Sequence, residues 1–332
     1  MRDDTRRAFV AGLAAGLLPR PRRASAQGKS SKPRVAVLVY PRRQEGFPLA
    51  DSLRAGLREA GWVDGRNITV DIHYAESLED LPRAAAVLVA SKPDVVVAAA
   101  TPNAVALKQA TDTIPIVTAA AADPIGAGLV ASLARSGGNV TGLTLATPDI
   151  QAKRLQILKE AVPAASHVAY VPNTGVRGPA TSQWIDESSA AAKVLGVRLT
   201  VVDLGSDPNA WDRLLGATKR NGVNAMTVME SSVIFTNRKL IAELALKHRL
   251  PGIFAWRQAP EAGCLMSYGA NVAAIFHRAA TFVDKILKGA KPTDLPLEAP
   301  REFELVINAK TAKVLGLTIP PSVLVRATQV VE

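Results

Sequence analysis

Cysteine is nearly absent from this chain, since Cys264 is the only one in 332 residues. A single cysteine cannot form an internal disulfide. The four histidines are scattered, so that no Cys/His pair has the spacing of a metal site. The residues around Cys264 are apolar, which predicts a buried and unreactive thiol. We therefore expect neither a disulfide framework nor a metal centre.

Aromatic residues are also scarce, at 5%, although hydrophobic residues as a whole make up 48% of the chain. Alanine, valine and leucine dominate the apolar content. This composition favours helices packed on parallel strands over an aromatic-rich β-sandwich. The length suits two domains of ordinary size.

Hydrophobic runs long enough to span a membrane are missing. The apolar run at residues 8–18 is too short to cross about 30 Å of hydrocarbon as a helix. Basic residues precede this run, and the small residues Ala24-Ser25-Ala26 follow it. This arrangement predicts that residues 1–27 are an export signal removed near Ala26, and that the protein works in the periplasm.

The route of export depends on the arginines of this segment. Arg6 and Arg7 stand together before the apolar run, and three more arginines lie between the run and the cleavage site. The pair resembles a twin-arginine signal, and the later arginines hinder the general secretion route. An ordinary secretory signal is the alternative. No cysteine lies near the cleavage site, which argues against a lipid anchor.

Acidic residues are fewer than basic ones, and the formal net charge is +11. The export signal carries six Arg and two Asp, so that the remainder of the chain has a net charge of about +7. No block of five like charges occurs in it. A solvated basic surface is therefore a better interpretation than nucleic-acid binding.

The motifs of common α/β enzymes are absent as well. Val39-Tyr40-Pro41-Arg42 stands where a glycine-rich nucleotide loop would follow the first strand. No nucleophile elbow, Walker loop or His-Glu-x-x-His occurs. An exported α/β enzyme is thus the weaker alternative, and we predict no catalytic residues and no cofactor.

Two series of strand-like apolar runs are present. Corresponding runs begin about 130 residues apart, as in two copies of one architectural half. Helix-like segments fill the gaps, which predicts parallel sheets with right-handed crossovers. The fold class is therefore α/β, with two doubly wound lobes and a cleft between them. The runs are 34–40, 68–72, 94–100 and 114–120 in the first series and 167–172, 198–203, 224–229 and 250–256 in the second.

Three further segments are interpreted as crossings between the lobes, namely 140–145, 267–269 and 303–306. Residues 129–158, which include the first of them, are interpreted as the link between the halves. These crossings predict a three-strand hinge. The expected lobes are 32–143 with 269–302, and 144–268 with 303–332.

Ligands of open parallel sheets bind beyond the carboxyl ends of the strands. Thr101 follows a strand and opens a helix, where a hydroxyl and free backbone N–H groups attract a carboxylate. Alternatively, Thr101 only caps its helix, with Pro102 at the first helical position. Asp123 either caps the next helix or accepts from a ligand amine. Glu230 pairs either with an ammonium group or with a neighbouring arginine.

The candidate site collects the polar and aromatic residues at these strand ends. Its aromatic members could form platforms for an apolar ligand, and packing within the fold is the alternative for each of them. The candidates are Tyr40, Thr101, Pro102, Asn103, Asp123, Asn173, Gly175, Glu230, Ser231, Trp256 and Tyr268.

Several strings of residues occur together over the length of the mature chain. They include Gly137-Gly138-Asn139-Val140-Thr141-Gly142, Lys153-Arg154-Leu155, His248-Arg249-Leu250-Pro251, Leu265-Met266-Ser267-Tyr268-Gly269 and Phe303-Glu304-Leu305-Val306-Ile307-Asn308. With them, the chain resembles the substrate-binding proteins of ABC transporters of the tryptophan and tyrosine uptake type.

This resemblance implies a type I-like periplasmic binding protein that closes on a small solute. It also implies delivery to an inner-membrane permease with a cytoplasmic ATPase, and ligand contacts at Thr101, Asp123 and Asn173. We expect a monomer and a carboxylate-bearing solute, with an aromatic or branched amino acid as the first specific candidate. Docking onto a receptor for sensing is an alternative to transport.

The chain departs from the family pattern at three places. Cys264 stands where the family usually has glycine, and the segments 40–46 and 229–235 differ from the commonest pattern. Both segments should border the cleft, so the identity of the solute need not carry over.

Overall fold

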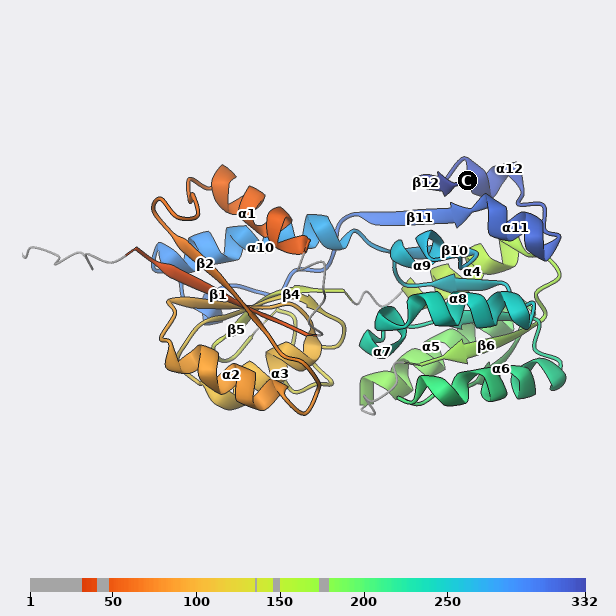
Figure 1. Ribbon diagram of the computed structural model, residues 1–332, viewed down its shortest axis with the longest axis horizontal. Coiled ribbons are helices and arrows are strands. Elements are labelled where there is room, and N and C mark those ends of the chain that lie inside the picture. Colours follow the sequence, from red (N-terminus) through yellow and green to blue (C-terminus); the bar gives the residue numbers. More distant parts are fainter. Residues whose placement is uncertain (1–31, 41–47, 135, 146–149, 173–178) are drawn as a thin grey trace, which may run out of the picture. The chain divides into compact units, whose positions relative to one another are not determined.

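Two sheets organise the chain, and each is built from the apolar runs of one half (Figure 1). The computed structural model describes residues 32–40, 48–134, 136–145, 150–172 and 179–332. Residues Pro33–Glu332 form one contact unit that contains both sheets. The predicted export signal lies outside the described residues.

The first sheet has five parallel strands in the order β2-β1-β3-β4-β5. Alternate strand residues point to opposite faces, so Val35 and Val37 pack against α1 and α10 while Ala36 and Leu38 pack against α2 and α3. The elements are β1 Arg34–Val39, α1 Leu49–Glu59, β2 Thr69–Tyr74, α2 Leu81–Ala90, β3 Val95–Ala98, α3 Thr101–Ala110, β4 Ile116–Ala121, β5 Val140–Thr144 and α10 Val272–Leu287.

The second sheet has seven strands in the order β12-β11-β10-β9-β8-β6-β7. Helices α4 and α5 cover one face, and α6 and α8 cover the other. The pairing is parallel except between β10 and β11, which run antiparallel. The elements are α4 Ile150–Ala161, β6 His167–Val171, α5 Pro179–Val194, β7 Arg198–Val201, α6 Trp211–Arg220, β8 Ala225–Val228, α7 Ser232–Thr236, α8 Arg238–Lys247, β9 Gly252–Phe254, α9 Gln258–Glu261, β10 Met266–Ala270, β11 Phe303–Asn308, α11 Ala309–Leu315, α12 Pro321–Leu324 and β12 Gln329–Val331. The described part of the chain also contains two short 3₁₀ helices, Pro208–Ala210 and Pro292–Asp294.

The predicted fold class is confirmed, because both series of apolar runs form parallel strands covered by helices on both faces. The chain passes from the first sheet to the second within residues 129–158, as predicted, but the predicted link was too long. These residues contain β5, which pairs with β4 in the first sheet, and most of α4. The predicted first crossing at 140–145 is therefore a buried strand of that sheet, and the chain leaves it only after Leu145.

The other two predicted crossings lie in β10 and β11, which pair from Met266↔Ile307 to Ala270↔Phe303. The rings of Tyr268 and Phe303 stack at a centroid distance of 5.8 Å. Strand β10 runs one residue beyond the predicted lobe boundary at 269, and Asn271 then caps α10 through a 2.8 Å bond from the Ala274 N–H. The exact lobe boundaries stay a prediction.

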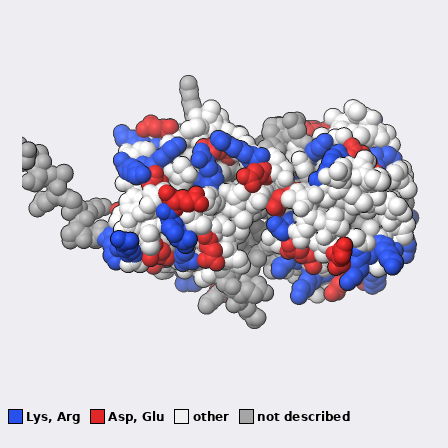
Figure 2. All heavy atoms as spheres, turned by 90° about the horizontal axis from the view of Figure 1, so that it is seen from above, with Lys and Arg blue, Asp and Glu red and all other residues white. Residues whose placement is uncertain are grey.

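The buried position of Cys264 and the mixed charges of the surface agree with what the sequence predicts. Cys264 is buried in the apolar cluster around α8, and burial raises the pKa of its thiol. Basic and acidic side chains are interspersed over the face shown in Figure 2. Within the described ranges, every helix falls short of the length and apolar content that crossing a membrane requires.

Candidate functional site

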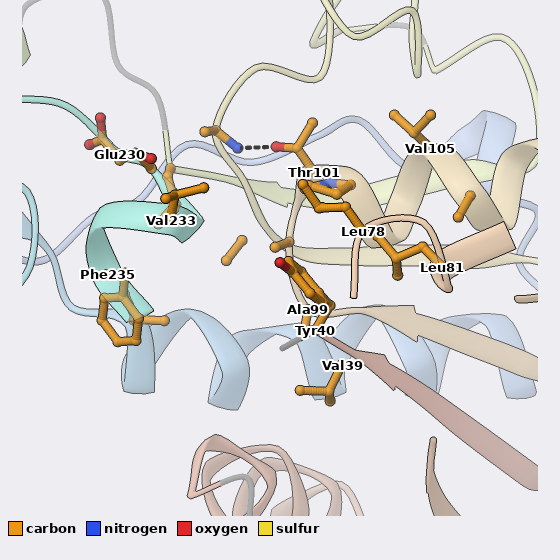
Figure 3. A pocket seen from close by; sticks show the side chains of 18 of the residues that line it. Val39, Tyr40, Leu78, Leu81, Ala99, Thr101, Val105, Glu230, Val233 and Phe235 are labelled. Carbon is orange, nitrogen blue, oxygen red and sulfur yellow. Dashed lines mark hydrogen bonds between the residues drawn. The ribbon is translucent and has the colours of Figure 1, made fainter. Parts of the chain in front are cut away.

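A cavity of about 570 Å³ lies at the carboxyl ends of the strands, and residues from the elements of both sheets line it (Figure 3). Figure 3 shows Glu230, Val233 and Phe235 on one side of it. Leu78, Leu81, Thr101 and Val105 lie on the other. Apolar side chains form most of the lining, and a few polar groups interrupt them. This combination suits a small organic solute with one polar end.

Six of the eleven predicted site residues line this cavity. They are Tyr40, Thr101, Pro102, Glu230, Ser231 and Trp256. Asn173 and Gly175 lie outside the described residues. The remaining three, Asn103, Asp123 and Tyr268, are not among the described lining residues.

Thr101 does not cap α3, because Ala100 is the N-cap and Thr101 is the first helical residue. Its hydroxyl instead accepts a 2.9 Å bond from the backbone N–H of Ala122, which follows β4. This bond, drawn in Figure 3, joins the ends of two neighbouring strands. Thr101 is 8% exposed, and its hydroxyl keeps a proton that it can donate. Capping and ligand contact were the predicted alternatives, and a brace between strand ends is a third role.

Asn103 and Asp123 lie behind the wall. Asn103 is fully buried, and its amide donates a 3.0 Å bond to the carbonyl of Leu38 at the end of β1. Asp123 accepts a 2.7 Å bond from the N–H of Gly126 and so caps a turn rather than the helix that was predicted. Burial raises the pKa of the Asp123 carboxyl, and the Gly126 bond opposes that shift. Both residues hold backbone segments next to the wall in place without lining the cavity themselves.

Glu230 lies at the end of β8 and pairs with Arg154, so the arginine alternative is confirmed. The two guanidinium nitrogens of Arg154 donate to the two carboxylate oxygens at 2.5 and 3.2 Å. Arg154 is completely buried, whereas Glu230 is 12% exposed in its side chain and lines the cavity. A carboxylate has more than two acceptor positions, so Glu230 can still receive a bond from a solute.

Aromatic residues supply the apolar part of the wall. Trp256 and Phe235 meet edge to face at a centroid distance of 5.3 Å. Tyr40 lines the cavity from the end of β1, and burial, with a smaller effect of the Glu79 charge, raises the pKa of its phenol. Tyr268 stacks on Phe303 between β10 and β11, so it serves packing rather than the wall.

Sequence reasoning missed several residues of the wall and one charged residue behind it. Helix α10 contributes Val272 and Phe276 to the wall, and the rule that ligands bind beyond strand ends does not point to residues within a helix. Arg154 lies behind the wall, where it pairs with the wall residue Glu230. It was missed because its segment was interpreted as a link and its partner lies 76 residues away. The string Lys153-Arg154-Leu155 in the family resemblance was the available signal. Among the described residues, His, Cys, Asp and Glu form no group of three that could hold a metal ion.

Comparison with known proteins identifies the family of the chain. Residues 35–331 match the family of ABC transporter substrate binding proteins. The chain is 26% identical over 279 residues to a tyrosine-binding protein of Clostridioides difficile, covering 81% of this chain and 78% of the relative.

Two solved structures are also similar. One is an ABC domain in complex with L-Trp from Streptococcus pneumonia, with a TM-score of 0.80, 26% identity and coverage of 91% of this chain and 100% of that one. The other is a conserved domain protein from Vibrio cholerae, with a TM-score of 0.80, 28% identity and coverage of 90% and 100%.

Proposed function

Because the chain belongs to the ABC transporter substrate-binding protein family and has the type I-like fold of periplasmic binding proteins, we propose that it is the periplasmic receptor of an import system. It captures a small solute and delivers it to an inner-membrane permease driven by a cytoplasmic ATPase. It acts as a monomer after loss of its export signal, and it leaves the solute chemically unchanged.

The observation that carries this proposal is the cavity at the strand ends, whose wall comes from both halves of the chain. A solute that touches Thr101 and Glu230 contacts both halves at once. Such a solute binds the closed arrangement better than the open one and shifts the population toward it. The permease then distinguishes loaded from empty protein by the closed arrangement of the lobes.

The composition of the wall supports a solute with an apolar body and a charged end. The first turn of α3 offers backbone N–H groups and the Thr101 hydroxyl to a carboxylate. Glu230 offers acceptor positions to an ammonium group, and Trp256 and Phe235 provide an apolar surface. An aromatic or branched amino acid has this form. One relative is a tyrosine-binding protein and a similar structure holds L-Trp, which supports the same choice.

A thermal-shift screen tests the proposal. L-tryptophan, L-tyrosine, L-leucine, aromatic acids and other carboxylates are added to the mature protein, and a ligand at 100 times its Kd stabilises it by about 2.7 kcal/mol. Calorimetric titration then gives the affinity. Thr101→Ala and Asp123→Ala should weaken binding, the second because the turn at Asp123 lies between the wall residues Ala122 and Ala127. Thr293→Ala, at an exposed threonine outside the wall, is the matched control.

Two outcomes would contradict the proposal. A screen in which none of these compounds stabilises the protein removes the predicted solute class. Turnover of a bound compound by the purified protein would establish an enzyme instead.

A further inference from the structure

Arg154 makes contacts with three separate parts of the second half of the chain. It projects from α4, and its side chain is completely buried. Its Nε donates a 2.7 Å bond to the carbonyl of Tyr268, in addition to the paired bonds to Glu230. A longer contact of 3.4 Å reaches Gln151 on the same helix. Each of the three guanidinium nitrogens therefore has a partner.

The partners of Arg154 connect the cavity with the hinge. Glu230 belongs to the cavity wall. Tyr268 belongs to β10, and only Asn271 separates β10 from α10. Helix α10 in turn packs in the core of the first sheet and contributes Phe276 to the cavity wall. One guanidinium thus lies between a wall residue of the cavity and a strand that leads from the second sheet to the first.

Close packing around β10 leaves this strand little freedom to move separately. A Cβ atom on Gly269 would lie 1.8 Å from the carbonyl oxygen of Ala255 and 3.6 Å from a guanidinium nitrogen of Arg154. Only glycine fits between these neighbours. Because the Arg154 charge is buried, separating it from Glu230 would leave an uncompensated charge in a low dielectric. Glu230, Arg154 and the Tyr268 carbonyl are therefore held together.

We propose that Arg154 is a positioning residue that couples occupancy of the cavity to closure of the hinge. This inference rests on the proposed function, since it assigns the means by which a captured solute biases the hinge. A cationic group of the solute that binds Glu230 attracts the same carboxylate that Arg154 holds. The displacement passes through the guanidinium to β10 and from there toward α10.

The test measures the distance between the two halves by pulsed electron paramagnetic resonance. Spin labels are placed at Val87→Cys on α2 and Val194→Cys on α5, where the native residues are 55% and 87% exposed. Cys264 is buried, so it stays unlabelled. The distance distribution is recorded without solute and with saturating L-tryptophan, for the otherwise unaltered protein and for Arg154→Met and Arg154→Lys.

Arg326→Met is the matched control. Arg326 forms an ion pair with Glu160 at the other end of the same helix, so this variant also removes an arginine–glutamate pair from α4. We expect the parent protein and Arg326→Met to move to a single shorter distance with L-tryptophan. Arg154→Met should retain a long-distance population at saturation and bind L-tryptophan at least about tenfold more weakly. Arg154→Lys, which keeps the charge but loses the paired bonds, should lie between them.

A solute-free comparison separates failure of this inference from failure of the proposed function. Arg154→Met lacks the bond from the guanidinium to the Tyr268 carbonyl of β10. Its distance distribution should therefore be broader than that of the parent protein even before solute is added. If the parent protein does not bind L-tryptophan, or if its label-to-label distance does not shorten on binding, the proposed capture of this solute by closure fails. The solute-free comparison then still tests whether Arg154 holds β10 in place. If Arg154→Met closes as completely as the parent protein and only its melting temperature falls, the role of Arg154 is structural and the coupling is refuted.

A second variant covers the case in which Arg154→Met does not fold. Glu230→Gln keeps the size of the side chain and one acceptor oxygen but removes the charge. It leaves the buried Arg154 charge without its partner, so we expect a lower melting temperature, and circular dichroism checks that the fold is retained. The folded variant should lose part of the closure at saturation. Full closure of Glu230→Gln would overturn the proposal.

Discussion

The brace between Thr101 and Ala122 gives a prediction that can be worked through in magnitude. Thr101→Val replaces the hydroxyl by a methyl group of similar size, so the packing at the start of α3 is retained. The Ala122 N–H then loses its 2.9 Å partner in a partly buried position. Leaving such a donor unsatisfied costs about 1–3 kcal/mol. In a protein of this size, that corresponds to a fall in melting temperature of about 2–4 °C per kcal/mol.

The assay is urea unfolding of Thr101→Val and of Thr101→Ser, the matched variant that keeps the hydroxyl. We expect the midpoint to fall for Thr101→Val at an unchanged denaturant slope, and to fall much less for Thr101→Ser. The affinity for the solute should fall with it, because Ala122 belongs to the cavity wall. Equal unfolding midpoints for the two variants would refute the brace.

The remaining predictions concern charge, packing and backbone conformation. The raised pKa of Asp123 means that the folded state holds this proton more tightly than the unfolded state, so stability is lost as pH rises from the unfolded pKa through the folded one. Unfolding curves should therefore show the stability of Asp123→Asn increasing relative to that of the parent protein from pH 3 to pH 6. A constant difference in stability would contradict this. Phe276→Ala removes a fully buried ring from the core between the first sheet and α10 and should cost about 3–5 kcal/mol of stability in urea unfolding. A cost below about 1 kcal/mol would show that the ring is not packed as described. Gly142→Ala places a Cβ 2.2 Å from the backbone oxygen of Thr118 at a φ of +122° and should cost at least about 3 kcal/mol of stability. Gly205→Ala, at a positive φ in open space, should cost only about 1–2 kcal/mol. Similar costs for the two variants would argue against the close approach of β4 and β5.

The strands could be predicted because burial on both sheet faces leaves a simple mark on the sequence. Val95–Ala98 and Ile116–Ala121 are buried throughout, so they read as uninterrupted apolar runs. Helix α4 was missed because its buried face includes Gln151 and Arg154, which weaken the amphipathic pattern. The polar groups that hold the site together are therefore the ones that concealed this helix.

The positions of the site residues could be predicted only in part. The rule that ligands bind at the carboxyl ends of strands led to Thr101 and Glu230, both of which line the cavity. It could not separate wall residues from residues behind the wall, because that depends on side-chain direction. Asn103 turns toward the Leu38 carbonyl and Asp123 toward the Gly126 N–H, and both bonds are tertiary or turn contacts that sequence spacing does not reveal.

A crystal structure of the mature protein grown with the best-stabilising amino acid would test the central claim most directly. The account predicts intact solute in the cavity, with its carboxylate at the start of α3 and its ammonium group within hydrogen-bond distance of Glu230. Electron density for the solute at any other place, or contacts to one half of the chain alone, would contradict it.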